Sequence, residues 1–126
     1  MDERLVQGIA LFNDGEFFRC HEVLEETWRL ERGPRRRFLQ AVIHVAVGFY
    51  HSQRGNPAGA VAQLRKGLEK LAGYAPSYEG INTAQLYRDA LAATEAIEGG
   101  GRLTTYPRIH TSSDTSSYLR RHPPSR

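Results

Sequence analysis

Hydrophobic residues recur every three or four positions along most of the chain, which is the spacing that puts them on one face of a helix. Glycine, proline and asparagine interrupt this pattern, and these residues commonly end or begin helices. The pattern predicts five helices, over residues 2–12, 14–31, 34–54, 57–73 and 83–98, with a loop over residues 74–81. We therefore expect an all-α protein folded as a compact antiparallel bundle of four to five helices.

The predicted helix over residues 34–54 is hydrophobic almost all round between Phe38 and Tyr50. A helix of this kind lies at the centre of a fold and is covered on several sides. Its β-branched residues would also suit a strand, but the length of the segment and its continuity with the arginines before it favour a helix. We expect it to be the central helix of the bundle.

Two helix starts carry the pattern of a capping box, in which a polar residue and a second one three positions later satisfy free backbone N–H groups. Asn13 and Glu16 are placed to begin the second helix in this way. Asn82 and Gln85 are placed to begin the fifth. Both starts are therefore predicted to have a side-chain cap.

The length and composition fit one globular domain. The chain has 126 residues, of which 40% are hydrophobic and 25% charged, and these values are typical of globular proteins. No hydrophobic run approaches the ~20 residues of a membrane span, and the charged N-terminus leads into a helical pattern instead of the hydrophobic core of a leader peptide. Cys20 is the only cysteine, so we expect it to be a packing residue without a disulfide. We expect a cytoplasmic protein.

The end of the chain differs from the rest in composition. Three consecutive glycines at 99–101 end the last predicted helix, and residues 102–126 are rich in Ser, Thr, Pro and Arg. The formal net charge is +3, but this segment alone holds five arginines and one acidic residue. We predict a helical bundle domain over residues 1–101 and a mostly disordered basic tail over residues 102–126, from which residues 106–109 could pack on the bundle.

The second predicted helix carries the motif His21-Glu22-x-x-Glu25-Glu26-x-Trp28. Residues three and four apart are neighbours on a helix, so His21 lies over Glu25 and three carboxylates crowd two turns. Crowded like charges are unfavourable unless a cation offsets them. That cation could be a nearby arginine or a bound metal ion.

The next helix could add to this group. A tight turn near residue 33 joins the two helices, so they should run antiparallel, and counting from the turn places His44 near the height of His21 and Glu22. Gln40 and His51 lie on the same face of that helix as His44. A cluster on facing helices is therefore possible.

Imidazole and carboxylate groups in one pocket suit either metal binding or acid–base chemistry. The candidate catalytic residues are His21, Glu22 and Glu25; the candidate metal ligands are His21 and Glu25, for a divalent ion; and the candidate ligand-pocket residues are Trp28, Gln40, His44 and His51. Neither the Glu-x-x-His pattern of di-metal bundles nor the His-Glu-x-x-His pattern of zinc proteases is present.

A longer string around this motif resembles a known family. It runs Phe12-Asn13-Asp14-Gly15-Glu16-Phe17-Phe18-x-Cys20-His21-Glu22-Val23-Leu24-Glu25-x-x-Trp28-Arg29, and continues through residues 37–43, 46–51 and 54–60. The string resembles the bacterial, archaeal and plant family called domain of unknown function 309, over about residues 5–73. The resemblance implies an all-helical bundle and no particular activity. It also implies that His21, Glu22, Glu25, Trp28 and Gln40 are characteristic of the family, whereas His44 departs from the family pattern.

Several functions remain open at this point. The chain could be an enzyme or a metal-binding protein that uses the His/Glu pocket. It could instead be a non-enzymatic protein–protein interaction module in which the motif is structural, with its acids solvated and paired with Arg19 and Arg29. A weak similarity in spacing between residues 15–28 and 55–68 favours the second hypothesis. A homo-oligomer or a protein partner is compatible with both, whereas no nucleic-acid motif accompanies the basic residues.

Overall fold

The computed structural model describes residues 2–111 of the chain. Within this range it contains five α-helices and one short 3-10 helix, and no strand. The elements are α1 (Glu3–Asn13), α2 (Phe17–Leu30), α3 (Pro34–Gln53), α4 (Pro57–Leu71), η1 (Ala72–Tyr74) and α5 (Thr83–Glu98). The predicted all-α bundle is therefore confirmed, and the predicted bounds of the third and fifth helices agree with the observed ones to within a residue.

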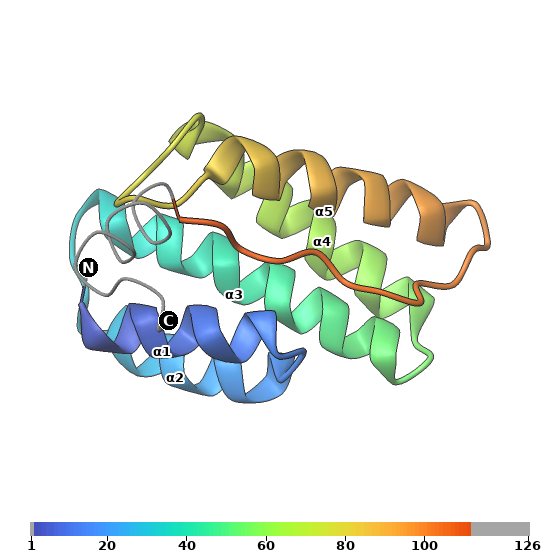
Figure 1. The fold of residues 1–126 in the computed structure, drawn as a ribbon, viewed down its shortest axis with the longest axis horizontal. Coiled ribbons are helices and arrows are strands. Elements are labelled where there is room, and N and C mark those ends of the chain that lie inside the picture. Colours follow the sequence, from blue (N-terminus) through green and yellow to red (C-terminus); the bar gives the residue numbers. More distant parts are fainter. Residues whose placement is uncertain (1, 112–126) are drawn as a thin grey trace, which may run out of the picture.

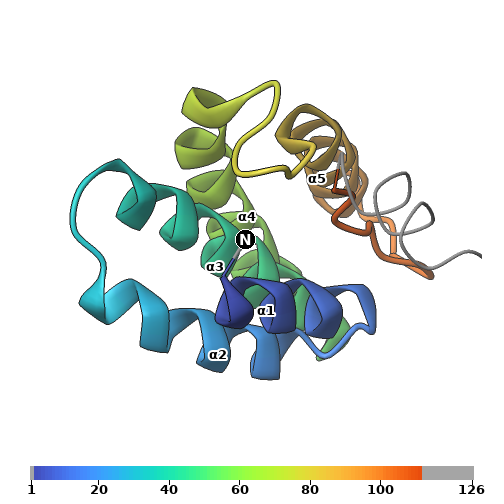
Figure 2. The same ribbon diagram turned by 60° about the vertical axis from the view of Figure 1, so that its left-hand side comes forward.

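Helix α3 is the central element, as predicted. Each helix packs on the next one along the chain, so that α3 lies between the α1–α2 hairpin and the α4–α5 hairpin (Figures 1 and 2). Nine of its residues are buried: Phe38, Leu39, Ala41, Val42, Ile43, Val45, Ala46, Gly48 and Phe49. This burial explains why the segment is hydrophobic on nearly every side.

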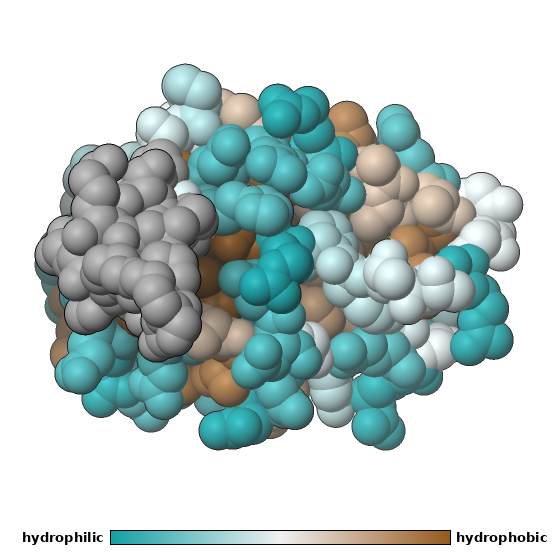
Figure 3. All heavy atoms as spheres, viewed as in Figure 1, coloured by the Kyte–Doolittle hydropathy of each residue, from teal (hydrophilic) through white to brown (hydrophobic). Residues whose placement is uncertain are grey.

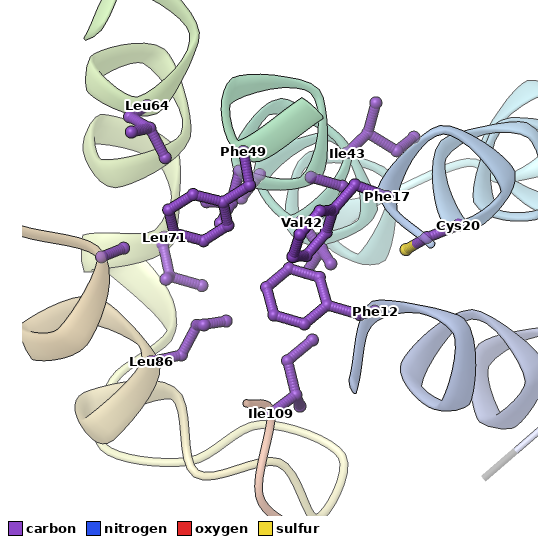
Figure 4. Close-up of a cluster of buried hydrophobic side chains, with 14 of the residues drawn as sticks. Phe12, Phe17, Cys20, Val42, Ile43, Phe49, Leu64, Leu71, Leu86 and Ile109 are labelled. Atoms are coloured by element: carbon purple, nitrogen blue, oxygen red, sulfur yellow. The ribbon is translucent and has the colours of Figure 1, made fainter. Parts of the chain in front are cut away.

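Aromatic rings pack on one another in the core, edge to face for Phe12 and Phe17 and tilted by 51° for Phe17 and Phe49. Phe12 lies 5.0 Å from Phe17 between ring centroids, and Phe17 lies 5.4 Å from Phe49. The three rings come from α1, α2 and α3, so they join the first hairpin to the central helix (Figure 4). The edge-to-face geometry of Phe12 and Phe17 is one in which aromatic pairs attract each other beyond simple burial.

The two predicted capping boxes have different outcomes. The side chain of Asn82 accepts a hydrogen bond from the N–H of Gln85 at 3.0 Å, which confirms the cap of α5. The prediction for α2 was wrong: the helix begins at Phe17, and Glu16 at its N-cap makes no side-chain capping bond. Asn13 instead forms the last residue of α1, and its side chain binds the backbone of Ile109.

Residues 103–111, here called the strap, run in extended form from the end of α5 back along the bundle (Figure 1). Ile109 is buried, and the ring of Tyr106 lies 5.3 Å from that of Phe17 and 5.4 Å from that of Phe49. Packing at residues 106–109 is what the sequence suggested, although the bundle was predicted to end at residue 101. The rest of the predicted tail, residues 112–126, lies outside the described residues.

The face that carries the strap is largely hydrophilic, with hydrophobic atoms visible between polar ones (Figure 3). Among residues 2–111, no helix has both the length and the hydrophobicity needed to span a bilayer.

Candidate functional site

His21, Glu25 and Arg29 contact one another in a row along one side of α2. The Nε2 atom of His21 is 3.5 Å from the Oε2 atom of Glu25, one turn further along. The other oxygen of Glu25 accepts a hydrogen bond from Arg29 at 3.0 Å, a second turn along. The carboxylate of Glu25 is therefore shared between an imidazole and a guanidinium, which offsets the crowding of acids predicted from the sequence.

Phe18 continues this row towards the start of α2. The ring of Phe18 lies 5.4 Å from the ring of His21 and 5.2 Å from the ring of Tyr50 on α3. Phe18 is nonetheless 45% exposed. The guanidinium of Arg54 lies 5.7 Å from the centroid of the Tyr50 ring. Aromatic rings and a charged guanidinium therefore lie side by side at this end of α2 and α3.

Trp28 and Arg36 form the other end of the row. The guanidinium of Arg36 lies 4.0 Å from the centroid of the indole, within the range of a cation–π interaction. The same guanidinium donates a hydrogen bond to the backbone carbonyl of Trp28 at 2.8 Å. We call the whole row the α2–α3 seam; it consists of Phe18, His21, Glu25, Trp28, Arg36 and Tyr50.

Of the remaining predicted residues, His51 lies next to the seam, with its ring centroid 6.1 Å from that of Tyr50, and His44 faces α4. His44 pairs through Nδ1 with the Oε1 atom of Gln63 on α4, at 2.8 Å. His51 lies 3.4 Å from Asn56 at the α3–α4 turn, between His51 Nδ1 and Asn56 Nδ2. Glu22 is exposed on α2, and Gln40 is half-buried on α3. The predicted group therefore divides, with His21, Glu25 and Trp28 in the seam and His44 facing α4.

The surroundings of His44 favour its neutral form. Burial lowers the pKa of the imidazole, and the positive charges of Lys70 and Lys66 lower it further. The hydrogen bond to Gln63 acts in the opposite direction without reversing the shift. His44 is thus suited to be a neutral hydrogen-bonding residue between α3 and α4.

Two ring nitrogen atoms of the seam are buried. Within residues 2–111, His21 Nδ1 and Trp28 Nε1 are buried and have no hydrogen-bond partner. The other nitrogen of His21 faces Glu25. No three side chains of His, Cys, Asp or Glu in this part of the chain come together as a metal site would require. The roles predicted for His21 and Glu25 as base or metal ligand stay predictions.

A surface cavity of about 400 Å³ lies elsewhere, where the α3–α4 turn faces the segment after α5. Its lining residues are Ser52, Gln53, Gly55, Pro57, Ile97, Gly100, Gly101, Arg102, Leu103 and Tyr106. None of the residues predicted for the site takes part in it.

Sequence reasoning missed Phe18, Tyr50 and Arg36 as members of the site. A signal for Phe18 was present, because it directly follows Phe17 on a helix. Consecutive residues on a helix differ by about 100° in direction, so two adjacent phenylalanines cannot both face the same core. Phe17 is fully buried, which leaves Phe18 at the edge.

These contacts define a small all-helical bundle with a His–Glu–Trp row along its second helix. Residues 5–63 match the family described as Domain of unknown function (DUF309). This match confirms the resemblance predicted from the motif string, although it ends at residue 63 and not at about residue 73. The matched region covers most of α1, all of α2 and α3 and the first part of α4, and so contains the complete seam.

Two curated relatives are similar to this chain. An "Uncharacterized protein" of Aquifex aeolicus (strain VF5) is 26% identical over 98 residues, covering 75% of this chain and 29% of the relative. "Uncharacterized protein YpuF" of Bacillus subtilis (strain 168) is 47% identical over 47 residues, covering 36% of this chain and 26% of the relative. The chain thus spans less than a third of the length of each.

Proposed function

We propose that this chain is a helical protein–protein interaction module whose partner docks on the α2–α3 seam. The observation that carries the proposal is the position of Phe18, an aromatic residue that is 45% exposed although its ring contacts His21 and Tyr50. Aromatic residues and arginine are enriched in the energetically important parts of protein interfaces. The seam contains both kinds of residue, since Trp28 and Arg36 lie at its other end.

The contacts of His21 support an interaction role over a catalytic one. An enzyme that used this imidazole would need an accessible nitrogen, whereas one nitrogen is buried and the other faces Glu25. A structural role for His21, in which it keeps the surface in place for a partner, needs only these contacts. They fix the His21 ring against Phe18 and the carboxylate of Glu25 against Arg29. A preorganised surface loses less side-chain entropy when a partner binds.

The length of the relatives also supports a module. Both curated relatives carry the similar region within chains more than three times as long as the region. When such a domain binds a partner protein, the other segments of the same chain are placed close to that partner. The cytoplasmic location stays a prediction from the sequence.

A site-specific photo-crosslink tests the proposal. A photoreactive amino acid is introduced in place of Glu22, which is exposed one turn from Phe18, and the protein is expressed in its native host. The matched control carries the same amino acid in place of Arg88, which is exposed on α5. We expect one discrete covalent adduct with a second protein from position 22 and none from position 88. The same adducts from both positions, or none from either, would contradict a partner on the seam.

A further inference from the structure

One side of the central helix α3 stays partly exposed. Between residues 38 and 51, the only residues of α3 that are not buried are Tyr50, which belongs to the seam, and Gln40, His44, Val47 and His51. The last four follow one another at steps of three and four residues, so they lie on one face of the helix. Helices α2 and α4 pack on α3 from two sides (Figure 2), and this stripe of α3 lies between them.

Helix α4 borders the stripe with polar and positively charged side chains. Gln63 bonds to His44 at 2.8 Å, and the charges of Lys66 and Lys70 act on the same imidazole. Arg37 is exposed and lies two turns before His44 on the same side of α3. We call this surface the α3–α4 face; it consists of Arg37, Gln40, His44, Gln63, Lys66 and Lys70.

The cations of the α3–α4 face have no acidic partner within the bundle, although their neighbours in the sequence do. Arg35 pairs with three carboxylates, and Arg65 pairs with an acid of α5. Within residues 2–111, no carboxylate oxygen lies within 4.0 Å of a side-chain nitrogen of Arg37, Lys66 or Lys70. The positive charge of this face is therefore left for a group outside the bundle.

We infer that the α3–α4 face binds an acidic segment of another protein. Carboxylates of the segment pair with Arg37, Lys66 and Lys70, and its neutral side chains lie over the half-buried stripe of α3. Hydrogen bonds between ammonium or guanidinium groups and carboxylates are among the strong ones, and complementary charge also speeds the encounter of two proteins. The inference goes beyond the proposed function, because this face is formed with α4 and the seam is formed with α2.

The charges on the other side of the stripe favour a protein segment over a nucleic acid. Helix α2 carries Glu25 in the seam and Glu22 at an exposed position. A nucleic acid has a negative charge at every phosphate and would be repelled there, whereas a protein segment can carry its acids on one side only. The α3–α4 face also contains no aromatic ring on which a base could stack.

A photo-crosslink from α4 tests the inference in the full chain. The photoreactive amino acid replaces Ala62, which is exposed one turn before Lys66, and the adduct formed in the native host is sequenced by mass spectrometry. We expect a protein segment with a net negative charge. The seam is tested from position 22, so either test can fail without the other. No adduct, an adduct with nucleic acid, or a segment without net negative charge would overturn the inference.

Charge reversal then tests the cations themselves. The crosslinked segment is made as a fluorescent peptide, and its affinity for the full chain is measured by anisotropy. We expect Lys66→Glu with Lys70→Glu to weaken binding by at least about tenfold, because two attractive contacts become repulsive. Arg88→Glu with Arg102→Glu, at exposed positions away from this face, changes the net charge equally and should leave the affinity within about twofold. Equal affinities of the two double variants, both folded by circular dichroism, would overturn the inference.

Discussion

Asn13 binds the backbone of Ile109 with both ends of its side-chain amide, although the two residues are 96 positions apart. Asn13 ends α1, and Ile109 lies buried in the strap. A buried backbone N–H and carbonyl must each find a partner, and an extended segment without a neighbouring strand cannot supply them itself. The amide of Asn13 takes the place of such a strand, and so attaches residues beyond α5 to the first hairpin.

Replacing Asn13 by alanine should therefore destabilise the whole bundle. Alanine leaves both groups of Ile109 without a partner in a buried position, and we expect a loss of about 2 kcal/mol in the free energy of unfolding. Urea denaturation followed by circular dichroism measures it. Asp14→Ala, at the exposed neighbouring position, serves as the control. A variant as stable as the control would show that the strap adds little to the fold.

We predict that Arg35 is a second residue that stabilises the fold by linking segments far apart in the sequence. Its guanidinium donates to Glu31 at 2.8 Å and to Glu79 at 2.7 Å, and it also pairs with Asp2. Burial alone would lower the pKa of Arg35, but the bonds to Glu79 and Glu31 outweigh it and raise the pKa. Because the side chain is 17% exposed, solvent screens these contacts only in part.

Arg35→Ala should accordingly lower the free energy of unfolding by about 2 kcal/mol, since hydrogen bonds to charged groups exceed neutral ones. Arg37→Ala, at an exposed position two residues away, should change it by less than about 0.5 kcal/mol. Chemical denaturation of both variants gives the comparison. Equal effects of the two substitutions would mean that Arg35 acts as an ordinary surface charge.

Helices α3 and α4 approach each other closely at Gly48. A Cβ atom there would lie 2.6 Å from Cγ of Leu64 and 3.2 Å from the carbonyl oxygen of Ala60. Gly48→Ala should thus separate the helices and cost about 1–3 kcal/mol, even though alanine is the better helix former. Gly73→Ala is the control, because a Cβ atom at Gly73 would have no neighbour within 4 Å. Thermal melting of both variants tests this, and a higher melting temperature for Gly48→Ala would refute the close approach.

His44 should make stability depend on pH. Because its pKa is lowered in the folded protein, the unfolded chain binds the proton more readily. Stability should therefore be full above the unfolded pKa of about 6.5 and fall as the pH decreases below it, towards the folded pKa. His44→Leu should remove this part of the decrease, whereas His110→Gln, at an exposed position, should retain it. Unfolding free energies measured between pH 7 and pH 5 test the difference, and parallel curves for the wild type and His44→Leu would exclude the effect.

Local sequence patterns predicted the helices but not the contacts between distant segments. Asn13 and Asn82 have the same local pattern, with a Glu or Gln three positions later, yet only Asn82 caps a helix. The difference is the competing partner of Asn13, which lies 96 residues away and leaves no trace in the local spacing.

Only part of the candidate site could be predicted from the sequence, for a related reason. Counting residues from the α2–α3 turn estimates how far along α3 a residue lies, but each residue also turns by about 100° around the helix axis. His44 therefore bonds to Gln63 on α4, while the ring that α3 brings to α2 is Tyr50. The neighbours within α2 were easier to predict, because the spacing of His21 and Glu25 alone brings them together.

The most direct measurement of the proposed interaction is the yield of the photo-adduct from position 22 with and without Phe18→Ser. Phe18 is half exposed, so this substitution should lower the free energy of unfolding by only about 1 kcal/mol and leave the bundle folded. We predict that the adduct is lost in the Phe18→Ser protein while its circular dichroism spectrum is unchanged. An adduct formed in equal yield by the folded variant would contradict a partner bound at the α2–α3 seam.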